Sequence, residues 1–186
     1  MLVNQISFYD DPIRFTQKVN ELCDELDERV KKGEGVFPKG TKRILIAGSP
    51  FAIPNWKLHS IIENSGAVVV GEESCVGSRN YRELTDENFS TIEEGIEKIA
   101  SRYLTIDCAC FTPNRERLDN ILELRKSSNA DGVIHYSLQF CTPYMMEAFK
   151  IEKQIDFPYM RIETDYSMED FGQLKTRVEA FIETLK

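Results

Sequence analysis

The sequence predicts an α/β fold, a three-layer sandwich in which helices cover both faces of a mostly parallel sheet. Short apolar segments alternate along the chain with longer segments whose apolar residues recur every three or four positions. The short segments, such as RILIAG at 43–48 and GAVVV at 66–70, lack the polar alternation of a strand that faces water. Buried strands that alternate with helices are typical of a Rossmann- or flavodoxin-like sheet.

The first element that we expect is an amphipathic helix over residues 12–31. Its apolar positions recur at helical spacing: Phe15, Val19, Leu22, Leu26 and Val30. Cys23 lies beside this stripe and is expected to pack within it. The segment KKGEGVFPKG at 31–40 has the lysines, glycines and proline of a linker. We therefore expect a leading helix and linker over 1–40 and an α/β domain over 41–186.

The remaining elements follow from the same two patterns. Strands are expected at 43–48, 66–70, 131–134 and 159–163. Helices are expected at 54–64, 91–103, 115–126, 143–153 and 168–185. The sequence contains neither internal repeats nor low-complexity segments, so one α/β domain accounts for most of the 186 residues.

Several helix starts carry recognisable capping residues. Thr142-Pro143 and Thr112-Pro113 each match an N-cap followed by a proline in the first turn. Ser167 followed by Asp170 resembles a capping box. The turn Gly48-Ser49-Pro50 joins a strand to a helix, where backbone amides can hold a phosphate, although it matches neither the Walker nor the Rossmann fingerprint.

Three of the five cysteines follow predicted strands or precede predicted helices. Cys75 follows AVVV, Cys141 follows GVI, and Cys110 precedes a Thr-Pro helix start, so all three map to the carboxyl edge of the sheet, where such folds bind ligands. A helix N-terminus also favours the thiolate that soft metals bind. The pattern predicts zinc or an iron–sulfur cluster, although no C-x2-C pair is present. Cys108 and Cys110 form a C-x-C whose extended side chains point to opposite faces, and the helix start favours Cys110. The alternative is that these cysteines are buried core residues.

Other polar residues near these loops are weaker candidates. His135, expected at a strand end, is a possible proton donor, and Glu72, expected in the turn before Cys75, is a possible acid or base. The alternative for Glu72 is a solvated or capping carboxylate. His59 is expected within a helix, as a surface or satisfied core residue. The carboxylates of Glu73, Glu163 and Asp165 are acids, bases or substrate contacts, or else solvated or capping groups. Four arginines either meet a phosphate-bearing ligand or are solvated: Arg79, Arg82, Arg115 and Arg117.

The composition narrows the classes of function. The formal net charge is -8, which argues against a nucleic-acid partner, since such domains usually carry a basic face. No apolar run approaches the length of a membrane span, and the N-terminus does not resemble a signal peptide. We therefore expect a cytoplasmic protein without a membrane partner. In that compartment, the five cysteines are not expected to form disulfides.

Four segments together resemble a known family. GEESCVGSRNY, YLTIDCACFTPN, DGVIHYSLQFCTPY and IETDYSMEDFGQLKTRVEAF are similar, in that order, to the carboxyl-terminal region of the 2-hydroxyacyl-CoA dehydratase D-component and benzoyl-CoA reductase subunit family. The resemblance runs from about Arg43 to the end of the chain. Its most specific parts are QFC-x-PY and the IETDYS segment.

The resemblance implies an iron–sulfur cluster of the 4Fe-4S type in the subunit. The cysteine of QFC-x-PY is a cluster ligand in this family, which is Cys141 here, and Cys75, Cys110 and Cys108 are further candidates. An ATP-hydrolysing iron–sulfur activator protein supplies single electrons in the family. The electron forms a ketyl radical on a 2-hydroxyacyl-CoA, which then loses water. A homologous second subunit, or a homodimer, is the expected assembly.

The resemblance leaves two alternatives to a dehydratase. CACFTPN and GEESC look most like the branch that carries a double-cubane cluster, an ATP-dependent low-potential reductase of small molecules, which needs additional cysteines. The family's subunits are also longer and carry an amino-terminal domain, with further cluster cysteines, that this sequence lacks. The chain is therefore expected to be a fragment, part of a split subunit, or a non-catalytic paralogue.

Overall fold

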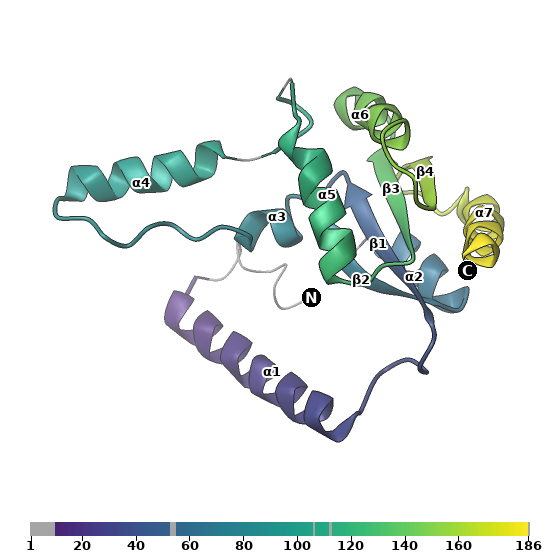
Figure 1. Cartoon of the computed structure of the whole chain (residues 1–186), viewed down its shortest axis with the longest axis horizontal. Coiled ribbons are helices and arrows are strands. Elements are labelled where there is room, and N and C mark those ends of the chain that lie inside the picture. Colours follow the sequence, from purple (N-terminus) through teal and green to yellow (C-terminus); the bar gives the residue numbers. More distant parts are fainter. Residues whose placement is uncertain (1–9, 53–54, 106, 112, 186) are drawn as a thin grey trace. The chain divides into compact units, whose positions relative to one another are not determined.

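The computed structural model describes residues 10–52, 55–105, 107–111 and 113–185. The chain divides after Thr41 into two compact units. The first contains helix α1 (Pro12–Lys32), and the second contains the sheet and all other helices (Figure 1). Among the described residues, no helix is both long and apolar enough to span a membrane.

Helix α1 begins and ends as its sequence predicts. The Asp11 carboxylate caps it by accepting a hydrogen bond of 3.0 Å from the Arg14 amide. Gly33 ends it in the left-handed conformation, with φ of 70°. The expected packing of Cys23 is wrong, because its side chain is exposed. Leu26 and Val30 on the same stripe are exposed too.

The second unit is built on a four-stranded sheet whose neighbouring strands are all parallel. Its strands are β1 (Lys42–Gly48), β2 (Ala67–Glu73), β3 (Gly132–Leu138) and β4 (Tyr159–Thr164), in the spatial order β2-β1-β3-β4. This order is that of the flavodoxin-like sheets. The predicted α/β three-layer sandwich is therefore confirmed, and the strand order reverses between β1 and β3, where such folds bind ligands.

Helices cover both faces of the sheet (Figure 1). Ile44, Ile46 and Ile134 face helices α2 (Lys57–Asn64) and α7 (Phe171–Thr184). Leu45 and Val133, one residue out of phase, face helices α5 (Glu116–Ser127) and α6 (Thr142–Glu152). The alternation explains why these strands read as unbroken apolar runs, because side chains on both faces are buried.

The remaining two helices lie between β2 and α5. Helix α4 (Ile92–Leu104) matches the predicted helix at 91–103, with Thr91 as its N-cap. The short helix α3 (Ser78–Tyr81) was not expected, because four residues are too few for a periodic apolar pattern. Helix α2 begins at Lys57; residues 53–54, where the sequence suggested its start, lie outside the described residues.

Two strands extend further than the apolar pattern predicts. Strand β2 continues through Glu72 and Glu73, and β3 continues through His135 to Leu138. The predicted turn at Glu72 and strand end at His135 are therefore wrong. Polar residues remain in these strands because buried partners satisfy them, which hydrophobic periodicity cannot reveal.

Two predicted helix starts are also corrected. Cys141 itself is the N-cap of α6, one residue before the expected Thr142. Helix α5 begins at Glu116, so Pro113 lies ahead of its first turn, and Thr112 lies outside the described residues.

A buried lysine fastens α2 to the end of β4. Lys57 Nζ donates to Thr164 Oγ1 at 2.6 Å, to the Asp165 and Ser167 carbonyls at 2.9 and 2.7 Å, and to Asp170 Oδ1 at 2.7 Å. Asp170 is the residue before α7, but its side chain makes no capping bond. The predicted capping box is therefore wrong, because Lys57 and Thr164 hold the carboxylate instead.

The turn after β1 needs glycine. Gly48 has φ of 132°, and a Cβ there would lie 1.9 Å from the Tyr136 carbonyl oxygen. The next residue, Ser49, donates its amide to that same carbonyl at 2.9 Å. This amide is used to close β1 against β3, so it does not point to a phosphate.

Candidate functional site

Four cysteines lie at the carboxyl edge of the sheet. Cys75 follows β2, Cys108 and Cys110 lie in the loop before α5, and Cys141 starts α6. None of the four is buried, which rules out the alternative that they are core residues. The sulfur atoms of Cys75 and Cys108 lie 4.0 and 3.9 Å from the hydroxyl oxygen of one tyrosine, Tyr144.

Local backbone geometry brings these cysteines to the edge. After β2, the Gly77 amide donates to the Ser74 hydroxyl at 3.1 Å, and a Cβ on Gly77 would lie 2.1 Å from the Glu72 carbonyl oxygen. The Cys75 turn therefore requires glycine. After β3, Phe140 adopts a left-handed conformation with φ of 69°, which is unusual for an aromatic residue, and it reverses the chain directly before Cys141.

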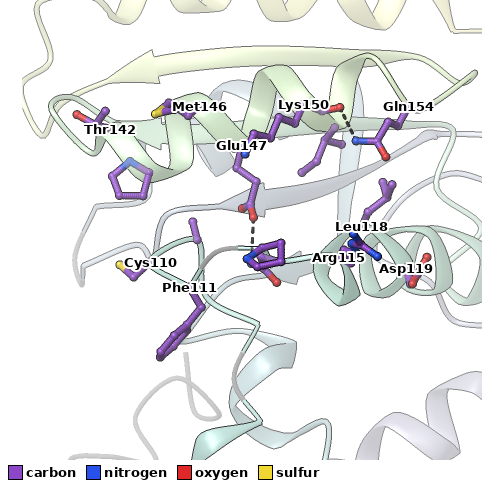
Figure 2. A pocket seen from close by; sticks show the side chains of 15 residues that line it. Cys110, Phe111, Arg115, Leu118, Asp119, Thr142, Met146, Glu147, Lys150 and Gln154 are labelled. Carbon is purple, nitrogen blue, oxygen red and sulfur yellow. Dashed lines mark hydrogen bonds between the residues drawn. The ribbon is translucent and has the colours of Figure 1, made fainter.

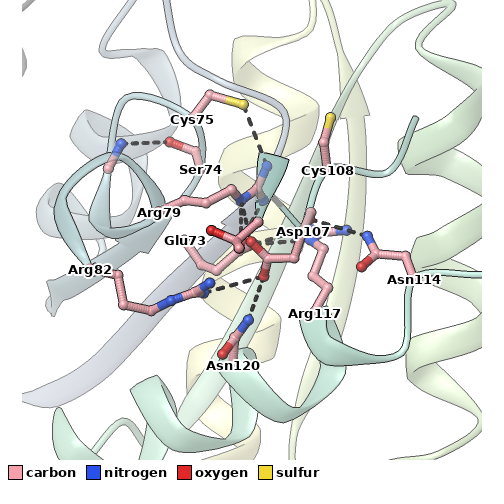
Figure 3. A network of polar contacts seen from close by, with 12 residues as sticks. Glu73, Ser74, Cys75, Arg79, Arg82, Asp107, Cys108, Asn114, Arg117 and Asn120 are labelled. Atoms are coloured by element: carbon pink, nitrogen blue, oxygen red, sulfur yellow. Dashed lines mark hydrogen bonds and ion pairs between the residues drawn. The ribbon is translucent and has the colours of Figure 1, made fainter. Parts of the chain in front are cut away.

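A buried ion network lies below the cysteines (Figure 3). Glu73 is its centre: Arg79 Nε donates to Glu73 Oε1 at 2.9 Å, and Arg117 donates to Glu73 Oε2 at 3.2 and 3.0 Å. The side chains of Glu73 and Arg79 are each 2% exposed, and that of Arg117 is 0% exposed. A buried carboxylate that accepts from two guanidinium groups is fully compensated in charge.

The network continues into the loop before α5 and into α6. Asp107 pairs with Arg79 at 3.5 Å and with Arg82 at 3.3 Å, and it accepts a hydrogen bond of 2.6 Å from Asn120. Burial raises the pKa of Asp107, but the hydrogen bond from Asn120 and the two arginines outweigh it and lower the pKa. The other end of the network is an ion pair between Arg117 and Glu147.

Arg79 and Tyr144 connect this network to the sulfur atoms. Arg79 Nη1 donates to the Tyr144 hydroxyl at 2.8 Å and to Cys75 Sγ at 3.4 Å. The Arg117 guanidinium lies over the Tyr144 ring, 4.8 Å from its centroid. Burial lowers the pKa of Arg79, but Glu73 and Tyr144 outweigh it and raise the pKa, so this cation is permanent. Cys75 therefore borders a fixed positive charge.

The thiols of the C-x-C segment influence each other. Burial raises the pKa of Cys108, but hydrogen bonds from the backbone and side chain of Cys110, with help from Tyr144 and Arg79, outweigh it and lower the pKa. The pKa of Cys110 is raised, first by its hydrogen bond to Cys108 and further by the charges of Cys141 and Cys75. Within the C-x-C pair, Cys108 is therefore the thiol more readily ionised.

The two weaker catalytic candidates have structural partners. His135 is fully buried, and Arg117 Nη2 lies 3.2 Å from its Nε2; because arginine always donates, this nitrogen is an acceptor. Burial, followed by the charges of Arg117, Arg79 and Arg161, holds the pKa of His135 well below its ordinary value. Glu72 lies 3.2 Å from His59 Nε2 and accepts a hydrogen bond of 2.6 Å from Ser74.

A cavity of about 620 Å³ opens beside Cys110, between α5 and α6 (Figure 2). Phe111, Leu118 and Met146 contribute apolar wall, while Arg115 and Lys150 contribute positive charge. Its volume is within the ordinary range of small-molecule sites. Cys110 is the cysteine of the four that lines it, which places the cavity next to the cysteine edge.

No cluster of three or more His, Cys, Asp or Glu side chains within the described ranges is arranged to hold a single metal ion. The structure places Cys75, Cys108, Cys110 and Cys141 on one edge of the sheet.

Sequence patterns do not reveal several members of this site. Tyr144 looked like a residue of the first turn of α6, and Asp107 and Glu147 carried no pattern at all. The four arginines looked like solvated side chains or ligand contacts, whereas Arg79 and Arg117 are buried ion-pair partners. The burial of a charge depends on tertiary contacts, and the available signal was only the clustering of arginine around the cysteine motifs.

Comparison with known proteins agrees with the family that the sequence resembles. The family model described as 2-hydroxyglutaryl-CoA dehydratase, D-component, matches residues 1–185. The chain is 36% identical to the putative dehydratase subunit YjiM of Escherichia coli K12, over 95% of this chain and 47% of that protein.

Two further relatives are named as beta subunits of dehydratases. The chain is 30% identical to the (R)-phenyllactyl-CoA dehydratase beta subunit of Clostridium sporogenes, over 98% of this chain and 47% of that protein. It is 25% identical to the (R)-2-hydroxyglutaryl-CoA dehydratase beta subunit of Acidaminococcus fermentans, over 92% of this chain and 45% of that protein. The chain spans about half the length of these relatives. With its family model matched from residue 1 to 185, the chain belongs to the 2-hydroxyglutaryl-CoA dehydratase D-component family.

Proposed function

We propose that this chain is an iron–sulfur subunit, or part of one, of a 2-hydroxyacyl-CoA dehydratase-like enzyme. The enzyme would use single electrons from an ATP-dependent activator protein to dehydrate a 2-hydroxyacyl-CoA. One observation carries this proposal: four cysteines that are not buried lie together on the ligand-binding edge of the sheet, above a buried network that includes a permanent cation. Membership of a dehydratase family supports the reaction class.

The residues present fit an iron–sulfur cluster. Cysteine thiolates are its usual ligands, and we assign Cys141, Cys75 and Cys110 to it, with Cys108 as a further candidate. A four-iron cluster binds its thiolates at different irons, so it does not need the tight group that a single ion requires. Thiolate ligands bring negative charge, and the Arg79 guanidinium, 3.4 Å from the Cys75 sulfur, supplies the opposite charge. When bound, the cluster would supply single electrons and a Lewis-acidic iron.

The cavity beside Cys110 is the place that we propose for a CoA ester. Its apolar wall suits an acyl chain, and Arg115 and Lys150, which line it together with the carboxylates of Asp119 and Glu147, would meet the negative groups of the ligand. Neither His135 nor Glu72 lines this cavity, so the proposal gives neither residue a step in proton transfer.

The proposed assembly contains a second, homologous subunit or a second copy of the chain. Two relatives bear the name of a beta subunit, which supports a partner subunit. We place the enzyme in the cytoplasm, where the five free cysteines would stay reduced.

A double-cubane reductase of small molecules is the second candidate. The observation that favours it is the position of Cys108, which approaches the same hydroxyl as Cys75, since a larger cluster needs additional thiolates. A CoA ester that alters the visible or EPR spectrum of the cluster would support the dehydratase. A spectrum that no CoA ester alters would support the reductase.

The first test is the iron and acid-labile sulfide content of the whole chain, purified without oxygen, together with its visible and EPR spectra. We expect iron and sulfide in stoichiometric amounts, lost in Cys141→Ser. The matched control is Cys23→Ser, because Cys23 is an exposed cysteine of α1, outside the four-cysteine edge.

A folded chain that is colourless, iron-free and impossible to reconstitute would contradict the proposal. It would favour the third reading, a non-catalytic paralogue that keeps the fold. Equal loss of iron in both cysteine variants would contradict the assignment of Cys141.

A further inference from the structure

Residues 82–105 form an arm that extends from the α/β unit. A loop leads outward, and helix α4 leads back; Figure 1 shows this helix, in teal, standing apart from the sheet and its covering helices. The arm contains neither a cysteine nor a residue that lines the cavity beside Cys110. The proposed function therefore leaves it without a role.

The loop of the arm packs along one side of its own helix. Lys98 Nζ donates to Asp86 Oδ2 at 2.6 Å, and the Ser90 amide donates to Glu94 Oε2 at 2.9 Å. The Phe89 ring lies so close to Gly95 that a Cβ there would come within 3.1 Å of it. The arm thus uses the polar side of α4 for its internal contacts.

The opposite side of α4 is apolar and exposed. Ile92, Ile96, Ile99 and Tyr103 are 75%, 61%, 48% and 62% exposed. An amphipathic helix normally turns its apolar side to a core and its polar side to water, and this helix does the reverse. Such a stripe on an extended arm marks a surface that another molecule covers.

The spacing of the stripe identifies the shape that fits it. The four residues are separated by four, three and four positions, which is the a/d spacing of a coiled-coil seam. A seam of this kind packs against another helix that carries the same spacing. The flanking Ala100 is small and allows a second helix to approach closely.

The charges of α4 favour a second copy of the same helix in the opposite direction. Glu93, Glu94 and Glu97 lie in its first half, while Lys98 and Arg102 lie in its second half. Two parallel copies would bring the acidic halves together, whereas two antiparallel copies bring each acidic half level with a basic half. The helix dipoles also attract each other in the antiparallel arrangement.

We propose that α4 is a self-association surface, in which the seams of two copies of this chain pair antiparallel. Ile96 then packs against Ile99 of the partner subunit, and Ile92 packs against Tyr103 of the partner subunit. A helix pair of this length forms a small interface, so association is reversible and depends on concentration. The proposal does not rest on the cluster or on the reaction.

The test is sedimentation velocity of the whole chain over a concentration series up to the sub-millimolar range, with a reductant that prevents disulfide formation. The wild-type chain should shift from monomer to dimer as its concentration rises. Ile96→Glu should remain a monomer with an unchanged circular dichroism spectrum, because the Ile96 side chain is exposed and its replacement leaves the fold intact. Ser101→Glu is the matched control: it adds the same charge on the opposite side of α4 and should still dimerise.

A mixing experiment tests the direction of pairing. Ile99→Lys alone should also be monomeric. Mixed in equal amounts with Ile96→Glu, it should form dimers again, because antiparallel pairing places the introduced carboxylate against the introduced ammonium. Parallel pairing would place each introduced charge against an isoleucine.

Three results would overturn the proposal. A wild-type chain that stays monomeric at every concentration would mean that something other than a second copy covers the seam. Dimers that survive Ile96→Glu would place the interface elsewhere. A mixture that stays monomeric would exclude the antiparallel arrangement.

Discussion

Two buried cationic sites lie at the carboxyl edge of the same sheet, and they differ in how completely their charges are enclosed. On the β4 side, Lys57 meets four oxygen atoms at 2.6 to 2.9 Å, all from the segment that leads from β4 into α7. On the β2 side, Arg79 and Arg117 share Glu73, and one Arg79 nitrogen continues outward to the Cys75 sulfur.

The difference shows how to distinguish a structural charge from one that serves a site. The acceptors around Lys57 outnumber the three donors of an ammonium group, so no donor remains for a ligand. Arginine has five donors in a fixed fork, and Arg79 uses some to hold Glu73 while it presents another to Tyr144 and Cys75. The guanidinium of Arg79 is therefore held in place by Glu73 and still has a donor that reaches the cysteine edge.

The largest expected effect is that of Arg117→Met. Arg117 is fully buried between Glu73 and Glu147, so its removal leaves Glu147 without its guanidinium partner and deprives Glu73 of one of two. Breaking a buried ion pair costs about 3–5 kcal/mol. Urea unfolding followed by circular dichroism should show a loss of this size in the free energy of unfolding.

Arg115→Met is the matched control for that prediction. Arg115 lies two residues away but is exposed, so the free energy of unfolding should change by less than about 0.5 kcal/mol. Equal effects of the two variants would mean that Arg117 contributes no more to the free energy of unfolding than a surface charge does. The network around Glu73 could then not be compared with Lys57 as a second buried cationic site.

The sequence predicted the architecture well because the apolar patterns of this chain are strong. Unbroken apolar runs at 43–48 and 66–70 overlap β1 and β2, and the periodic segments overlap the observed helices. The errors in strand length lie where polar residues sit in buried strands. Glu73 and His135 continue their strands because Arg79 and Arg117 compensate them, and these partners lie elsewhere in the sequence.

The candidate site was only half visible in the sequence. The positions of the cysteines after predicted strands or before predicted helices, together with the rule that ligands bind at carboxyl ends, located them without any contact information. The residues below them could not be found in this way. Tyr144 matters because α6 turns its hydroxyl toward Cys75 and Cys108, and no local pattern encodes that direction.

A smaller effect is expected for Lys57→Met. The substitution keeps much of the aliphatic packing but leaves Asp170, Thr164 and two carbonyl oxygens without their donor. Because hydrogen bonds to a charged group contribute about 1.5–3 kcal/mol, we expect urea unfolding to show a loss of about 2–3 kcal/mol. Lys175→Met, which removes an exposed lysine of α7, should change the stability little.

The pH dependence of stability gives this prediction a second readout. Burial raises the pKa of Asp170, but hydrogen bonds from Lys57 and Thr164 outweigh it and lower the pKa. A carboxyl whose pKa is lowered by folding stabilises the fold above its unfolded pKa of about 3.9, and that contribution is lost as the pH falls through the folded value. The free energy of unfolding, measured from pH 6 downward, should therefore depend less on pH in Lys57→Met than in the wild-type chain. An unchanged dependence would mean that Lys57 does not stabilise the Asp170 carboxylate.

The smallest expected effect is that of Tyr144→Phe. This variant tests most directly whether the arginine network influences the cysteine sulfur atoms. The substitution keeps the ring under Arg117 and removes only the hydroxyl that accepts from Arg79, so the stability should fall by about 1 kcal/mol. The hydroxyl also helps to lower the pKa of Cys108, so its loss should shift the alkylation of Cys108 to higher pH. Peptide mass spectrometry of the iron-free chain measures this shift, with Cys23 as the internal control and Tyr166→Phe as the matched variant. An unchanged pH dependence of Cys108 alkylation would mean that the Tyr144 hydroxyl interacts only with Arg79. The network of Arg79 and Arg117 would then not reach the Cys108 sulfur, just as Lys57 has no donor left for a ligand.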